Sequence, residues 1–93
     1  MKTQEFESVW DALEDTPAEA ENMKIRSRMM LDLKRHIKAH NLTQEEAARL
    51  FGVTQPRISD LMRGKIARFS MDSLTSMAAT AGLRVDVRIL SAA

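Results

Sequence analysis

The stretch that decides the fold spans residues 42–65 and has the sequence LTQEEAARLFGVTQPRISDLMRGK. It contains two short amphipathic helical patterns that meet at Gly52 and Val53, and a glycine just past a helix can take the left-handed conformation without steric cost. Thr43 followed by Glu46 predicts a capping box at the start of the first helix. We therefore expect two helices joined by a tight turn, which is a helix-turn-helix.

The second helix of this pair is expected to begin at Thr54 as N-cap, with Pro56 in the first turn, where a missing N–H costs little. Apolar residues at helical spacing then face inward: Ala47, Ala48, Phe51, Val53, Ile58 and Leu61. Polar residues stay outside as a donor-rich face: Gln44, Thr54, Gln55, Arg57, Ser59 and Arg63. Such a face suits base edges and phosphates. A helical hairpin that serves stability alone is the alternative, and it leaves this concentration of donors unexplained.

Asp60 departs from the DNA-facing pattern because a carboxylate repels phosphate. We expect it to pair with Arg57, Arg63 or Lys65, although it could also accept a hydrogen bond from a cytosine amino group.

The pattern LTQ-x-x-x-A followed by GV-x-Q-x-x-IS resembles the Cro/C1 repressor family, also called the XRE family. The residues that agree in type and spacing are Gln44, Ala48, Gly52, Val53, Gln55, Ile58 and Leu61. The resemblance implies a phosphate contact for Gln44, and contacts to bases or adjacent phosphates for Thr54, Gln55 and Arg57. Pro56 departs from the family pattern, which often has a base-contacting serine there. The full set of expected DNA-binding residues is Thr43, Gln44, Thr54, Gln55, Arg57, Ser59, Arg63, Lys65 and Arg68.

The charge of the chain is divided between two regions. Residues 1–22 contain one lysine and seven acidic residues, a net charge of −6, and residues 23–93 carry 13 basic and six acidic residues, a net charge of +7. A basic body attracts polyanions, whereas an acidic leader shields that body or meets a basic partner. We therefore expect residues 1–22 to form an acidic N-terminal helical arm and residues 23–93 to form the DNA-binding domain.

An apolar stripe runs along the expected helix in this arm: Phe6, Val9, Trp10 and Leu13. It either packs on the chain's own domain or docks into the groove of a partner protein, and we leave both interpretations open. Pro17 predicts a hinge after this helix, with Thr16 as a candidate N-cap for the next one.

From Ala18 to about His40 a long helical pattern has one apolar face: Ile25, Met29, Met30, Leu33 and Ile37. A basic loop is expected over residues 65–69, and a further helix from the N-cap Ser70 to about Ala81. Residues 83–89 then alternate apolar and charged side chains, which predicts a half-buried strand. Because a lone strand leaves its backbone groups unpaired, it needs a second copy of the chain or the sheet edge of another protein, so it predicts an oligomer, and we expect a homodimer. The candidate dimerisation residues are Val85, Val87 and Ile89.

These patterns predict a mainly α fold: a compact, lambda-repressor-like bundle of about five helices containing the helix-turn-helix, with one short C-terminal β-strand. The chain has 93 residues, no cysteine and no apolar run of about 18 residues. We expect no disulfide, no membrane association, no cofactor and a cytoplasmic location. Asp32, His36 and His40 share a helix face, but nothing supplies a further ligand in order, so we expect no metal site.

Residues 23–89 look like a narrower branch, the HigA-like antitoxins, because RFSMDSL follows the helix pair and a short strand comes at the end. The resemblance implies a dimer that binds double-stranded DNA at an inverted-repeat operator, represses its own operon and neutralises a small basic RelE-like or ParE-like toxin. A stand-alone Cro/C1-type regulator without a toxin is the alternative, followed by a purely structural interaction module. An enzyme is not expected, since the chain has no cysteine nucleophile, no glycine-rich phosphate loop and no paired carboxylates in a predicted cleft.

Overall fold

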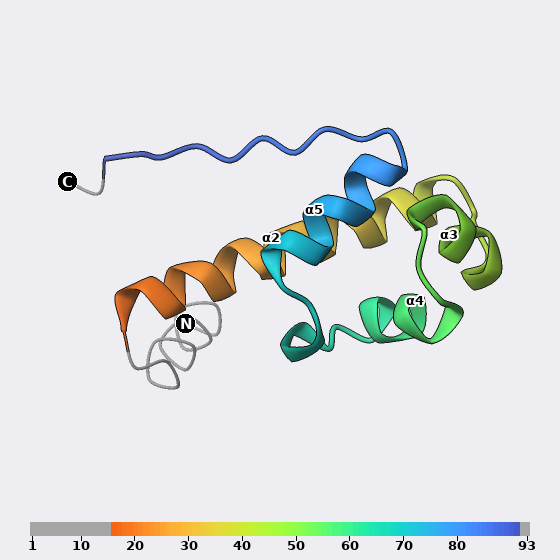
Figure 1. Cartoon of the computed structure of the whole chain (residues 1–93), viewed down its shortest axis with the longest axis horizontal. Helices are drawn as coiled ribbons and strands as arrows, with labels where there is room; N and C mark the ends of the chain where they lie inside the picture. Colours follow the sequence, from red (N-terminus) through yellow and green to blue (C-terminus); the bar gives the residue numbers. More distant parts are fainter. Residues whose placement is uncertain (1–15, 92–93) are drawn as a thin grey trace.

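The computed structural model describes residues 16–91 and shows four α-helices and one 3-10 turn in that range (Figure 1). These are α2 (Pro17–Ala39), α3 (Gln44–Phe51), α4 (Gln55–Met62), η1 (Ile66–Arg68) and α5 (Met71–Thr80). α5 packs along α2, and the α3–α4 pair lies toward the C-terminal end of α2. The expected mainly α fold is therefore confirmed. The expected helix with the Phe6, Val9, Trp10 and Leu13 stripe lies outside the described residues.

The long helix α2 begins and ends within a residue or so of the expected positions. The Thr16 hydroxyl accepts a hydrogen bond from the backbone N–H of Glu19 at 3.1 Å, and Pro17 follows in the first turn. The expected boundary between residues 22 and 23 lies inside this helix, which continues through it. None of the helices in residues 16–91 combines the length and the apolar composition that a membrane crossing requires.

The α3–α4 pair forms as its local sequence predicts. The Thr43 hydroxyl accepts from the Glu46 N–H at 3.1 Å, and the Thr43 N–H donates to Glu46 Oε1 at 2.8 Å, so the capping box is confirmed. Gly52 has φ +70°, the left-handed value that ends α3. Thr54 caps α4 by accepting from the Arg57 N–H at 3.3 Å. These local interactions fix both helix starts and the turn between them.

The core lies between α2, α3, α4, η1 and α5. Its largest fully buried side chains are Phe51, Ile58, Leu61, Phe69 and Leu74. Phe69 was expected in a basic loop, but it is 2 % exposed and follows the 3-10 turn η1, so residues 65–69 are part of the packed body. Burying an aromatic side chain of this size contributes about 1.5–3 kcal/mol, enough to hold an otherwise basic loop against the helices.

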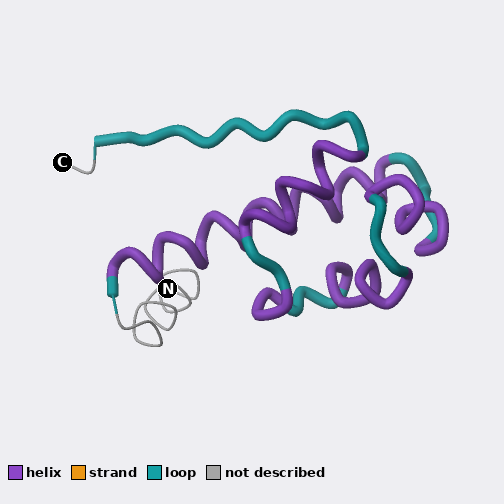
Figure 2. The backbone as a smooth tube through the Cα atoms, in the orientation of Figure 1, coloured by secondary structure: helices purple, strands orange, loops and turns teal. Residues whose placement is uncertain are grey.

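The expected C-terminal β-strand is not formed in the single chain. Beyond α5, residues 83–91 continue as extended chain, and Figure 2 shows no strand among the described residues. Val85, Val87 and Ile89 are 39 %, 50 % and 95 % exposed, so the expected half-burial fades along the segment. The physical reason is that a strand needs a neighbouring strand for its ladder, and the segment runs beside α2 and α5, whose interior backbone groups are already paired within each helix.

Candidate nucleic-acid interface

The expected DNA-binding residues lie at the helix ends of the α3–α4 pair and in the loop that follows. Gln44 begins α3, Thr54 and Gln55 begin α4, and Arg63 is its C-cap; all four are exposed. Thr54 uses one lone pair of its hydroxyl for capping, which leaves the hydroxyl hydrogen available to an acceptor outside the protein. The start of α4 therefore presents a side-chain hydroxyl and a side-chain amide to solvent.

Arg57 is placed differently from Thr54 and Gln55. Its guanidinium carbon lies 4.4 Å from the centroid of the Phe69 ring, and its Nη1 donates to the Arg68 carbonyl oxygen at 2.7 Å. The side chain is half-buried, and this contact is a cation–π interaction combined with a charge-assisted hydrogen bond. Arg57 thus ties α4 to the loop after it, while a guanidinium still has further N–H donors that could face DNA.

Asp60 forms ion pairs with two basic residues, of which Lys65 was expected and Arg68 was not. Its Oδ1 lies 3.9 Å from Lys65 Nζ, which confirms the pairing with Lys65, and its Oδ2 lies 3.2 Å from Arg68 Nη1. The Asp60 side chain is only 15 % exposed, whereas those of Lys65 and Arg68 are 37 % and 61 % exposed. The largely buried Asp60 carboxylate therefore holds two more exposed basic side chains, Lys65 and Arg68, on the loop after α4.

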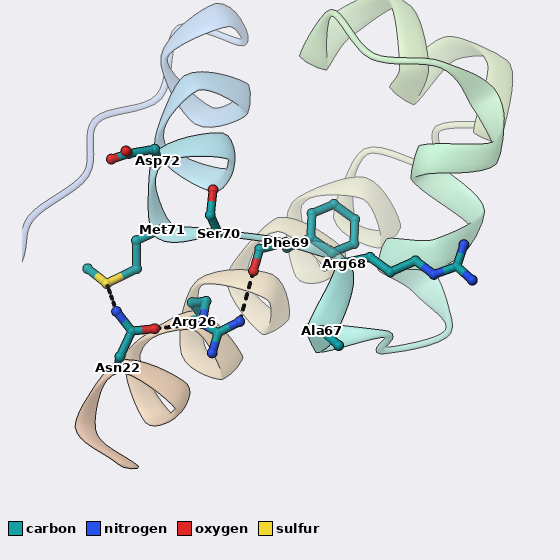
Figure 3. Close-up of a pocket in the computed structure, with 8 residues that line it drawn as sticks. All are labelled: Asn22, Arg26, Ala67, Arg68, Phe69, Ser70, Met71 and Asp72. Atoms are coloured by element: carbon teal, nitrogen blue, oxygen red, sulfur yellow. Dashed lines mark hydrogen bonds between the residues drawn. The ribbon is translucent and has the colours of Figure 1, made fainter. Parts of the chain in front are cut away.

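A second arginine holds the same loop from α2. Arg26 Nη1 donates to the carbonyl oxygen of Phe69 at 3.0 Å (Figure 3) and to that of Ile66 at 3.3 Å. In Figure 3 the Arg68 side chain extends away from Arg26. Sequence reasoning missed Arg26. The signal was its position four and seven residues before Met30 and Leu33, on the buried side of α2, where a charged residue must find partners.

The hollow drawn in Figure 3 lies between α2, η1 and the start of α5, and Asn22 and Arg26 in its lining bond to each other and to neighbouring groups. Asn22 Oδ1 accepts from Arg26 Nε at 2.7 Å, and Asn22 Nδ2 lies 3.2 Å from the sulfur of Met71. These contacts make the lining of the hollow part of the support of the loop.

The two histidines near the end of α2 interact with each other. The rings of His36 and His40 are 4.2 Å apart between centroids, and His40 Nδ1 lies 2.9 Å from the His36 carbonyl oxygen. Among the described residues no three side chains of metal-ligating type come together.

The geometry of the α3–α4 pair and a family comparison together identify the family of the chain. The pair consists of a capped helix, a glycine turn and a second capped helix whose start is exposed and polar. A helix-turn-helix domain family matches the chain over residues 12–90, which is most of its length. Among curated proteins, none matches. The chain therefore belongs to the family of helix-turn-helix domains, which are DNA-binding domains.

Proposed function

We propose that this protein is a sequence-specific transcriptional repressor that binds an inverted-repeat operator as a homodimer. The observation that carries the proposal is the exposed Thr54–Gln55 pair at the start of α4, together with Lys65 and Arg68, which pair with Asp60 on the loop after α4. In this arrangement Gln55 reads a base edge from the major groove, because its amide matches the paired acceptor and donor of adenine. Arg63, Lys65 and Arg68 contact phosphates, which supply affinity without sequence information.

The proposal is tested by comparing Gln55→Ala with Lys65→Ala on a preferred duplex selected from a random library. Gln55→Ala should weaken binding to that duplex by about 1–3 kcal/mol and relax the preference at one base position. Lys65→Ala should weaken all duplexes similarly and reduce the slope of affinity against salt by about one. If Gln55→Ala lowers affinity uniformly for every duplex, the base-reading role is wrong.

We further propose that the protein is the antitoxin of a type II toxin–antitoxin pair and binds a small basic RelE-like or ParE-like toxin. The support is the sequence of residues 1–22, whose net charge of −6 has the wrong sign for DNA and the right sign for a basic partner. Phe6, Val9, Trp10 and Leu13 would supply apolar anchors for that contact. The second candidate, a stand-alone regulator, keeps the DNA-binding role and has no such partner.

A deletion of residues 1–15 separates these candidates, and it retains Thr16, whose hydroxyl caps α2. The ligand is the product of an adjacent reading frame that encodes a small basic protein. Retained operator binding with lost affinity for that protein supports the antitoxin role. Unchanged affinity for that protein shows that the arm is not the contact, and no affinity in the full chain favours the stand-alone regulator.

A further inference from the structure

The C-terminal segment has two chemically distinct faces. Val85, Val87 and Ile89 alternate with Arg84, Asp86 and Arg88. Arg88 Nε lies 3.3 Å from Asp86 Oδ2, so these two charged side chains lie on the same side of the extended chain, as the two-residue period of a strand requires. The segment therefore already has the conformation of a strand and lacks a neighbour of its own kind.

Two-fold symmetry restricts how such a segment can pair with a second copy of itself. An antiparallel pair in one sheet is related by an axis perpendicular to the sheet, and this axis keeps each residue on the same face in both copies. Since directly opposed residues also share a face, the axis must pass between a residue and its own copy. Val85, Val87 and Ile89 then oppose one another, residues of the other face oppose residues of that face, and the register is described by a single central residue.

The charged side chains distinguish between the registers that are centred on a single residue. With Asp86 at the centre, Asp86 opposes its own copy and Arg84 opposes Arg88, so every charged contact is repulsive. With Val87 at the centre, Asp86 opposes Arg88 of the second copy twice, and Val85 opposes Ile89. With Val85 at the centre, Asp86 opposes Arg84 twice. Opposite charges directly opposed are stabilising, and only the registers centred on Val85 and Val87 place Asp86 opposite an arginine, so these two registers are favoured.

Length decides between these two registers. The Leu83 N–H already donates to the Ala78 carbonyl oxygen at 2.9 Å, and Gly82 turns the chain with φ +82°. A ladder between copies can therefore begin at residue 84. Centred on Val85 it pairs residues 84–86, whereas centred on Val87 it pairs residues 84–90. The longer ladder satisfies more backbone groups and joins more apolar side chains.

We propose that two copies of this chain pair antiparallel through residues 84–90 with Val87 on the two-fold axis and two Asp86–Arg88 ion pairs between the copies. This inference rests on the proposed homodimer and specifies its interface. In each copy Asp86 lies between its own Arg88 and that of the second copy, so four charges of alternating sign form one cluster.

A groove on the helical body lies next to the proposed pair of antiparallel segments. A groove of about 720 Å³ lies between the C-terminal segment, α2 and α5. Its apolar lining from the helices includes Ile25, Met29, Leu33, Leu74 and Ala78, and two of these, Ile25 and Met29, are partly exposed in the single chain. A second strand beside the first would cover this lining, and burial of apolar surface is the main favourable term in such an association.

Single-cysteine variants of the full chain test the register, since the natural sequence has no cysteine. Under mild oxidation Val87→Cys should form a disulfide-linked dimer fastest, because opposed residues lie about 4.5–5.5 Å apart at Cα, within disulfide range. Val85→Cys mixed with Ile89→Cys should give the mixed dimer. Faster self-linking of Val85→Cys assigns the other valine-centred register, and linking of Val85→Cys to Val87→Cys assigns the Asp86-centred one; either result overturns the proposal.

Charge reversal provides a second test that does not depend on cysteine chemistry. Asp86→Lys and Arg88→Glu should each weaken the dimer about 10-fold or more in sedimentation, since each opposes like charges at two symmetric positions. The double variant Asp86→Lys/Arg88→Glu should restore the dimer, and Asp86→Lys/Arg84→Glu should not. The reverse pattern of rescue overturns the proposal. The matched control is the reversed pair Glu45→Arg/Arg49→Glu, whose side chains lie 3.5 Å apart on α3 and should leave dimerisation unchanged.

These outcomes separate the register from the homodimer itself. A natural chain that stays monomeric in sedimentation up to high concentration contradicts the homodimer and the register together. A dimer that links through a different position contradicts the register alone. A dimer in which no cysteine in residues 84–90 links shows that another surface joins the copies. Operator binding is measured separately on the same variants.

Discussion

Two guanidinium groups hold the loop between α4 and α5 from different helices. Arg26 of α2 donates to the Ile66 and Phe69 carbonyl oxygens, and Arg57 of α4 stacks over the Phe69 ring and donates to Arg68. A loop that carries phosphate contacts gains precision when its backbone is held at several points, because less conformational freedom is lost on binding. At the scale of single residues, Arg57 therefore makes contacts within the protein and is also one of the proposed DNA contacts.

Arg57→Ala should lower the free energy of unfolding by about 1–3 kcal/mol, the combined loss of a cation–π contact and a charge-assisted hydrogen bond. Arg63→Ala is the matched control on the same helix, and since Arg63 is exposed it should change stability by less than about 0.5 kcal/mol. Urea denaturation at one protein concentration measures both. Equal effects of the two variants would show that Arg57 does not hold the loop.

Asp60→Asn should raise affinity for DNA of any sequence and make the salt dependence steeper by about one unit of slope. The reason is that the Asp60 carboxylate offsets part of the positive charge of Lys65 and Arg68, which lie within 3.9 Å of it. Asp32→Asn is the control, because its carboxylate pairs with Arg35 at 4.0 Å on α2. Lower affinity after Asp60→Asn would show that the carboxylate acts mainly by positioning the two cations.

At the scale of elements, the turn between α3 and α4 is fitted against the end of α5. A Cβ atom added at Gly52 would lie 3.1 Å from Cγ2 of Thr80, closer than ordinary contact, and φ at this glycine is +70°. At Gly64 φ is +72°, and an added Cβ would meet nothing within 4 Å. Comparing substitutions at these two glycines therefore distinguishes the cost of backbone strain from the cost of a steric clash.

Gly64→Ala should cost about 1–2 kcal/mol of stability from left-handed strain alone. Gly52→Ala should cost more, because Thr80 must also move. Combining Gly52→Ala with Thr80→Ser, which removes Cγ2, should recover the excess, as a thermodynamic cycle measured by urea denaturation would show. Additive effects of the two substitutions would mean that the turn does not press on α5.

At the scale of the whole molecule, a symmetric pair of helix-turn-helix units dictates the form of the DNA site. Each copy of the chain presents one α4, so the two-fold axis of a dimer requires an inverted repeat. The half-sites should be centred about 34–36 Å apart, one turn of B-DNA. Inserting about five base pairs between them would place the second half-site on the opposite side of the duplex.

We expect that insertion to lower affinity to that of a single half-site, while an insertion of about ten base pairs is tolerated better. Gel-shift titrations of the three duplexes at one salt concentration measure this. Equal affinity for all three would show that the two units bind independently.

The sequence by itself determined the local structure of the helix pair. Thr43 with Glu46, Gly52 with φ +70° and the Thr54 cap each act over three or four residues, so their outcome depends little on the rest of the chain. The same holds for the start of α5, where the Ser70 cap was expected and only its partner Ser73 was missed. The polar character of the start of α4 follows from spacing in the same way.

Only the tertiary structure decided which side chains face one another across the loop of residues 65–69. The contact of the Phe69 ring with Arg57 and the bonds from Arg26 join positions 12 to 43 residues apart, and no local pattern encodes such distances. The alternation in residues 83–89 predicted extended backbone correctly, but a β-strand also needs a neighbour with unpaired backbone groups. Within residues 16–91 the helices supply no such neighbour. The prediction of a strand was therefore wrong for a single chain, because strand formation depends on the arrangement of the whole fold.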